Sequence, residues 1–190
     1  ASFGPAIGLT CRECGTAVDL GLHYACMECF GPLEVAYDFG TVTHGDIESG
    51  PESIWRYRQL LPVPADVADR PNLNPGRTKL IRADHLAREL GMRRLWVKDD
   101  SGNPTHSFKD RVVAVAMAAG DVLGVKTIAC ASTGNLANAV AAAAARAGIH
   151  SVVFVPQDLE AGKIVTTAVY GGTLFAVEGN YDDVNRLCSE

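Results

Sequence analysis

The stretch that decides the fold is Thr127-Ile128-Ala129-Cys130-Ala131-Ser132-Thr133-Gly134-Asn135, in which an apolar strand runs into a polar turn. Alanine-rich sequence follows over residues 136–147 and is typical of a tightly packed helix. A second apolar strand is expected at residues 151–155. A strand, a short polar turn, a helix and another strand form one unit of a parallel sheet.

The same alternation extends in both directions from this stretch. It predicts strands at 94–98, 126–131, 151–155 and 173–177, and helices at 84–91, 108–119, 136–147, 160–170 and from about residue 182. Strands that alternate with helices indicate an α/β fold with a largely parallel, helix-covered sheet. Ligands of such sheets bind beyond the carboxyl ends of the strands, so polar residues there are candidate site residues.

Lys109 is the first candidate, in the stretch Ser107-Phe108-Lys109-Asp110-Arg111 at the start of helix 108–119. Ser107 and Asp110 have the spacing of a capping box, which would make Ser107 the N-cap. The N–H groups at a helix start carry partial positive charge, so a cation there is unfavourable. This position favours the neutral amine, which can attack a carbonyl. A solvated lysine near a helix start is the alternative interpretation.

Two further polar clusters follow predicted strands. Ser132-Thr133-Gly134-Asn135 can bind an anion through backbone N–H groups and hydroxyls, or can simply cap the next helix. Gly179-Asn180-Tyr181-Asp182 follows strand 173–177 with Arg186 one helical turn later, and an ordinary turn with a surface arginine is the alternative. Because parallel strands bring their carboxyl ends to one edge, we expect the three clusters to lie together.

Four of the six cysteines form two C-x-x-C pairs, which are Cys11 with Cys14 and Cys26 with Cys29. Each pair can aim two thiolates at one point, and two pairs close a tetrahedral metal site. Zinc is the expected metal, with iron as the alternative. A closed four-thiolate site has no open position, so its role would be structural. Redox-active thiols and an empty, decayed site are the remaining alternatives.

Charge and composition limit the kinds of partner. The 190 residues carry a net charge of −5 and have a pI near 5.5, which argues against electrostatic binding to nucleic acid or to a membrane surface. The longest apolar stretch, residues 139–145, is far shorter than the roughly 20 residues of a membrane span. We therefore expect a soluble cytoplasmic protein that acts on a small molecule.

Three regions are expected along the chain. Residues 1–40 form a small zinc-ribbon-like module, residues 41–76 a connector with a short helix, and residues 77–190 the amino-terminal part of an α/β catalytic region. The last apolar stripe, Val184 with Leu187, stops after about two turns. We therefore expect a truncated polypeptide.

Three stretches together resemble pyridoxal-phosphate enzymes of the tryptophan-synthase-β fold, and among them the threonine synthases. They are residues 96–111, with the specific core Asn103-Pro104-Thr105-His106-Ser107-Phe108-Lys109-Asp110-Arg111, the cluster Ser132-Thr133-Gly134-Asn135, and the cluster Gly179-Asn180-Tyr181-Asp182. The cysteine module is similar to the zinc-ribbon extension of some threonine synthases. The resemblance covers nearly the whole chain. It implies a lyase that converts O-phosphohomoserine and water to L-threonine and phosphate.

The resemblance also implies how the cofactor is held. Lys109 would hold pyridoxal phosphate covalently and later move protons at the substrate carbons. Asn135 would hydrogen-bond the cofactor's phenolic oxygen. A structural zinc ion would occupy the four cysteines, and a homodimer is the candidate assembly.

Substrate binding is implied at both remaining clusters. Ser132 and Thr133 would hold the substrate carboxylate. Asn180 and Arg186 would grip the phosphate of O-phosphohomoserine, a task that suits the guanidinium fork of an arginine.

Two departures from the family pattern keep alternatives open. Leu136 stands where the family often has a threonine, and we identify no glycine-rich loop suited to the cofactor's own phosphate. A dehydratase, or a synthase that uses another hydroxy- or phospho-amino acid, is one alternative. A non-catalytic zinc-ribbon module is another. The 190-residue piece is also expected to be inactive on its own, although its parent is an enzyme.

Overall fold

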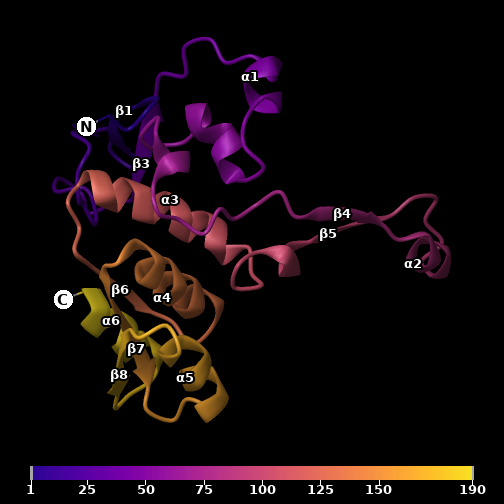
Figure 1. Cartoon of the computed structure of the whole chain (residues 1–190). Coiled ribbons are helices and arrows are strands. Elements are labelled where there is room, and N and C mark those ends of the chain that lie inside the picture. Colours follow the sequence, from indigo (N-terminus) through magenta and orange to yellow (C-terminus); the bar gives the residue numbers. More distant parts are fainter. Residues whose placement is uncertain (1, 190) are drawn as a thin grey trace.

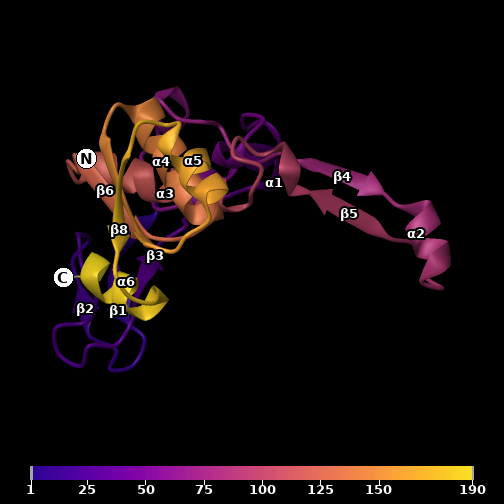
Figure 2. The ribbon, with the colours of Figure 1, turned by 90° about the horizontal axis from the view of Figure 1, so that it is seen from below.

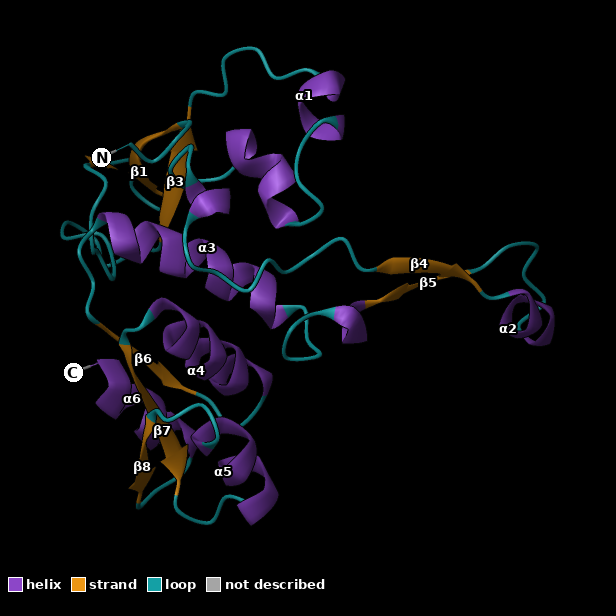
Figure 3. Cartoon of the chain, in the orientation of Figure 1, coloured by secondary structure: helices purple, strands orange, loops and turns teal. Residues whose placement is uncertain are grey.

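The computed structural model describes residues 2–189, which form three separate sheets with helices between them (Figures 1 and 3). The first sheet is antiparallel, with the order β2-β1-β3. It consists of β1 (Ala6–Cys11), β2 (Ala17–Val18) and β3 (Leu33–Tyr37). Cys11 pairs with Leu33 at the end of the β1–β3 ladder, so the strands carry the first C-x-x-C pair to the edge of the sheet.

The connector packs against the helix that begins at Lys109. It contains α1 (His44–Glu48), η1 (Ile54–Leu60) and η2 (Val67–Asp69). Trp55 is fully buried and forms a cluster with Val67 of the connector and with Ala114 and Ala118 of α3 (Lys109–Val122). The small alanines allow the indole to approach the helix closely, and burial of such a ring is a major source of stability.

A hairpin projects from the rest of the molecule (Figures 1 and 2). Strands β4 (Lys79–Arg82) and β5 (Trp96–Asp99) pair antiparallel, and α2 (Asp84–Glu89) lies at the tip. The expectation that strand 94–98 belongs to the parallel sheet is therefore wrong. The six-residue α2 is only about 9 Å long. It does not run back along the strands, and the chain instead reverses and pairs with the strand before it.

The parallel sheet predicted from the sequence is present with the order β6-β7-β8. Its strands are β6 (Thr127–Ala131), β7 (His150–Pro156) and β8 (Thr173–Val177), and its helices are α4 (Asn135–Ala147), α5 (Ala161–Ala168) and α6 (Tyr181–Ser189). Helices α4 and α5 cover one face, as right-handed crossovers between successive neighbouring strands require, and α6 lies on the other face (Figures 1 and 2). The fold class predicted from the sequence is confirmed.

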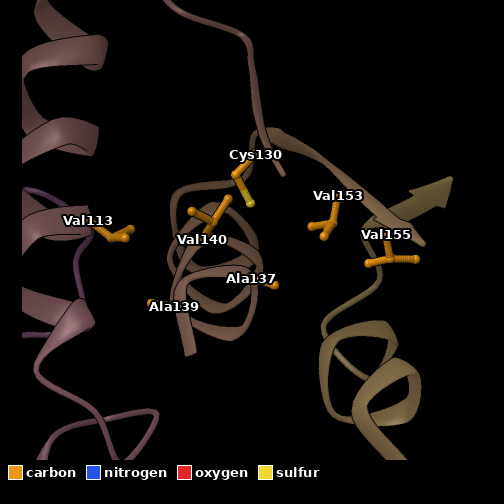
Figure 4. Packing of buried hydrophobic residues seen from close by; sticks show 7 residues of the cluster. All are labelled: Val113, Cys130, Ala137, Ala139, Val140, Val153 and Val155. Carbon is orange, nitrogen blue, oxygen red and sulfur yellow. The ribbon is translucent and has the colours of Figure 1, made fainter. Parts of the chain in front are cut away.

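The main core lies between α3, α4 and the parallel sheet (Figure 4). Val113, in the first half of α3, packs in one cluster with Ala137 and Val140, in the first half of α4. Helices α3 and α4 therefore pack against each other in this core. Val153 and Val155 of β7 close the cluster from the other side.

No helix among the described residues is both long and apolar enough to cross a membrane.

Candidate active site and metal centre

Lys109 is the first residue of α3 and is half-buried. Its backbone N–H donates to the Oγ of Ser107 at 3.2 Å, and its Nζ lies 4.8 Å from the centre of the Phe108 ring. The loop before it contains His106 at φ +60°, a left-handed conformation that is uncommon for residues other than glycine. The His106 Nδ1 lies 2.8 Å from the backbone oxygen of Ser101, which fixes the ring within the loop.

The predicted capping box at the start of α3 is absent, because the N-cap is Phe108 and not Ser107, and no side chain caps the helix. The Oγ of Ser107 accepts only from the Lys109 N–H, and the Asp110 carboxylate does not reach back to Ser107. It accepts instead from the backbone N–H of Thr105 at 2.8 Å and from the Thr105 hydroxyl at 2.7 Å. Thr105 supplies two hydrogen-bond donors to the Asp110 carboxylate. This side chain therefore stabilises the loop before α3 and not the start of the helix.

Arg111 closes a second set of contacts around the same loop. Its two terminal nitrogens each donate to an oxygen of Asp100 at 2.7 Å, and one also donates to the Thr78 hydroxyl at 3.2 Å. The Thr78 hydroxyl donates in turn to Asp100 at 2.7 Å. The fork of Arg111 and the Thr78 hydroxyl lower the pKa of Asp100 well below its ordinary value. This is the geometry in which an arginine–carboxylate pair is strongest.

The cluster after β6 lies at the same end of the molecule as Lys109. Asn135 begins α4, two residues before Ala137, and Lys109 begins α3, one turn before Val113. Helices α3 and α4 contact each other, and Val113 and Ala137 belong to one core cluster (Figure 4). Ser132 is buried, and its Oγ accepts from the Gly134 N–H at 3.3 Å.

The turn at Gly134 leaves room for a ligand. A Cβ added to Gly134 would meet no atom within 4 Å, and the Asn135 side chain is exposed. A small molecule could thus approach the backbone N–H groups of this turn directly. Thr133 is half-buried beside it.

The cluster after β8 contacts the cluster after β6. Tyr181, the first residue of α6, donates its hydroxyl to the backbone oxygen of Ala131 at 3.3 Å. The Oδ1 of Asn180 accepts from the N–H groups of Asp182 and Asp183, so Asn180 caps α6. Arg186 is exposed one turn further along α6. The structure thus joins the clusters after β6 and β8 at one edge of the parallel sheet, and Lys109 begins α3, which packs against α4.

The four paired cysteines of the first sheet converge on one point. Their sulfur atoms all lie within 4.8 Å of one another, with Cys11 and Cys29 separated by 3.4 Å and Cys14 and Cys26 by 3.7 Å. Sulfurs around a tetrahedral zinc ion lie about 3.8 Å apart, given zinc–sulfur bonds of about 2.3 Å. The hydroxyl and backbone N–H of Thr16 lower the pKa of Cys14 to about 6. The Gly31 N–H acts to lower the pKa of Cys29, but hydrogen bonds with Cys14 and Cys11 outweigh it and raise that pKa to about 12.

Sequence reasoning assigned no role to Thr78, Asp100 or Thr105. Thr105 and Asp110 are five residues apart, a spacing that matches no capping motif. The sequence therefore does not indicate that the Asp110 carboxylate binds Thr105 rather than Ser107. The contact of Thr78 with Arg111 joins residues 33 positions apart, so no local signal could have revealed it.

A cavity of about 630 Å³ extends along α3 from Asp110, in its first turn, to the carboxyl end of the helix, and along α4 from Ala139 to Ala147. Its lining includes Trp55, Ala118 near the end of α3, and Ala147 at the end of α4. Neither Lys109 nor Asn135 lines it. The candidate active site is therefore the open edge where the polar clusters meet.

Residues 72–190 match the protein family described as pyridoxal-phosphate dependent enzymes. The chain belongs to this pyridoxal-phosphate dependent enzyme family. The residues at the site suit the cofactor's reactive parts, because an amine, an exposed amide and an open turn of N–H groups gather at one edge. The described residues include no loop that we can assign to the cofactor's phosphate.

Curated relatives of this pyridoxal-phosphate family member carry the name threonine synthase. The Methanosarcina acetivorans protein is 37% identical over 96% of this chain and 46% of its own length. The Methanocaldococcus jannaschii protein is 38% identical over 95% of this chain and 46% of its own length. The chain thus spans about half the length of these curated relatives.

A solved structure is similar to the same part of the pyridoxal-phosphate fold. The crystal structure of an O-ureido-L-serine synthase matches with a TM-score of 0.56 and 25% identity, over 65% of this chain and 39% of the other. The fold is thus shared with an enzyme of a different name, so fold alone does not choose the substrate.

Proposed function

We propose that the protein is a threonine synthase, a pyridoxal-phosphate-dependent lyase that converts O-phosphohomoserine and water to L-threonine and phosphate. The observation that carries the proposal is the 37% identity to a curated threonine synthase over 96% of the chain. Lys109 and Asn135, which begin two helices that pack against each other, support it. Bound pyridoxal phosphate would supply an electron sink for carbanions formed on the substrate.

Lys109 and Asn135 are the proposed cofactor-binding residues. The Lys109 amine would bond to the cofactor's aldehyde carbon and, once released by substrate, would carry protons to and from the substrate carbons. Asn135 would donate its side-chain amide to the cofactor's phenolic oxygen. Both lie at amino ends of neighbouring helices, so a planar ring between them would contact each.

The proposed substrate-binding residues hold the two anionic ends of O-phosphohomoserine. Ser132 and Thr133, with the N–H groups of their turn, would bind the carboxylate. Asn180 and Arg186 would bind the phosphate, with Arg186 as the cation. The Tyr181–Ala131 hydrogen bond supports this division, because it ties the cluster after β8 to the edge that carries the turn.

We also propose that residues 1–40 hold one structural zinc ion through Cys11, Cys14, Cys26 and Cys29. The sulfur spacing supports this assignment. The described cysteines are free thiols, which suits the reducing cytoplasm where we place the enzyme. The connector 41–76, the catalytic region 77–190 and a homodimer remain parts of the same proposal.

Product analysis tests the reaction. The full-length natural protein is incubated with pyridoxal phosphate and with one of four amino acids, which are O-phosphohomoserine, serine, threonine and phosphoserine. We expect L-threonine and phosphate from O-phosphohomoserine alone, and neither product from Lys109→Ala. Turnover of another amino acid in preference would replace threonine synthase with a related lyase. Full activity of Lys109→Ala would remove this lysine from the reaction.

A further inference from the structure

The two residues that follow Lys109 each hold one end of the loop that precedes it. Asp110, which is only 4% exposed, accepts both hydrogen bonds from Thr105. Arg111 holds Asp100 through two bonds of 2.7 Å. The loop between Asp100 and Thr105 is therefore clasped at both ends by consecutive residues of α3.

We propose that Asp110 and Arg111 are positioning residues that fix the direction of the Lys109 amine through these two clasps. The inference rests on the proposed function for the role of Lys109 itself. Neither residue needs to touch cofactor or substrate. Each acts through the loop, because the loop sets the path by which the chain enters the first turn of α3.

The conformation of the loop explains why it must be held. His106, which follows Thr105 and leads into α3, lies in the left-handed region at φ +60°, which costs energy for a residue with a side chain. Asn103 is buried within the same loop, and its Oδ1 accepts from the Gly76 N–H at 2.9 Å. A strained turn persists only where its surroundings over-determine it. If a clasp were lost, the turn could relax and Lys109 would turn with it.

Four substitutions separate this role from simple packing. Thr105→Val removes the hydroxyl at nearly constant shape, and Thr105→Ser restores it. Arg111→Lys keeps the charge but cannot bind Asp100 through two parallel bonds. The matched control is Thr43→Val, because Thr43 donates its N–H and its hydroxyl to Asp46 in the same way, far from the site along the chain.

The first readout is the rate constant for attachment of pyridoxal phosphate, followed by absorbance after mixing, with the thermal midpoint measured beside it. We expect Thr105→Val and Arg111→Lys to slow attachment by about tenfold or more, since small displacements of a reacting group are costly. Thr105→Ser and Thr43→Val should stay near the wild-type rate. Attachment by Thr105→Val at the wild-type rate would overturn the proposal.

The second readout needs no cofactor and separates failure of the inference from failure of the proposed function. Hydrogen–deuterium exchange should rise in residues 100–109 of Thr105→Val and stay unchanged there in Thr43→Val. If wild-type Lys109 takes up no cofactor, the proposed function fails, and this comparison still decides whether the clasp holds the loop. Unchanged exchange in Thr105→Val would show that it does not.

Discussion

Asn180 and Asp183 cap α6 reciprocally. The Oδ1 of Asn180 accepts from the Asp183 N–H at 3.1 Å, and the Asp183 carboxylate accepts from the Asn180 N–H at 3.0 Å. The oxygen of the Asn180 side chain is thus engaged in the helix start. Its amide nitrogen remains the group that would donate to a substrate phosphate.

Asn180→Asp separates the two roles of this residue. An aspartate caps a helix as well as an asparagine does, so the free energy of unfolding should change little. The new negative charge replaces a donor, so KM for O-phosphohomoserine should rise by about tenfold or more. Steady-state kinetics and urea unfolding check these effects. An unchanged KM would leave Asn180 as a cap alone.

The stability of the site should depend on acid through Asp100. The Arg111 fork lowers its pKa in the folded state below the ordinary carboxyl value of 3.8. The contribution of Asp100 to the free energy of unfolding is therefore complete above about pH 5. It is lost as the pH falls below the pKa of Asp100 in the unfolded state toward its pKa in the folded state. At neutral pH the Asp100→Asn variant should be less stable than the wild type. Its free energy of unfolding should fall less than that of the wild type between about pH 4 and pH 2. Parallel acid slopes in wild type and variant would contradict this assignment.

The regular part of the fold could be predicted because its pattern is local. Strand 173–177 was predicted with the bounds that the structure shows, and strand 151–155 lies within β7. The apolar run of each strand and the alanines of α4 carry this information in neighbouring residues. The meeting of the clusters after β6 and β8 followed from topology, because the carboxyl ends of parallel strands share one edge. This argument does not cover the cluster at Lys109, because β5 is not part of the parallel sheet.

The rest depended on contacts that no local pattern contains. The apolar centre of strand 94–98, Leu95-Trp96-Val97, fits either a parallel sheet or a hairpin, and only its partner, Lys79–Arg82, decides between them. The capping box failed because Thr105 competes with Ser107 for the Asp110 carboxylate. The two-residue strand β2 is too short for any periodicity to reveal.

The core around β7 should be sensitive to the loss of buried methyl groups. Val153 is fully buried within the α3–α4–sheet cluster, so Val153→Ala should lower the free energy of unfolding by roughly 2 kcal/mol. Val165→Ala, on the exposed side of α5, should change it by less than about 0.5 kcal/mol. Urea denaturation compares the two. Equal changes in the free energy of unfolding for the two variants would show that Val153 does not belong to the core.

Removal of metal should loosen the first sheet. We expect about one zinc per chain by elemental analysis, and loss of that zinc in Cys11→Ser. A strong chelator should raise hydrogen exchange in β1 and β3, whereas residues 126–177 should keep their protection because their core lies elsewhere. If hydrogen exchange in β1 and β3 stayed the same after complete removal of zinc, this would contradict a structural role for the metal.

The central claim is that the amine of Lys109 holds the cofactor. The most direct measurement is borohydride reduction of the protein with bound pyridoxal phosphate, followed by peptide mapping of all five lysines. The account predicts label on Lys109, with the other four lysines as internal controls. Label on another lysine, or spread evenly over all five, would contradict it.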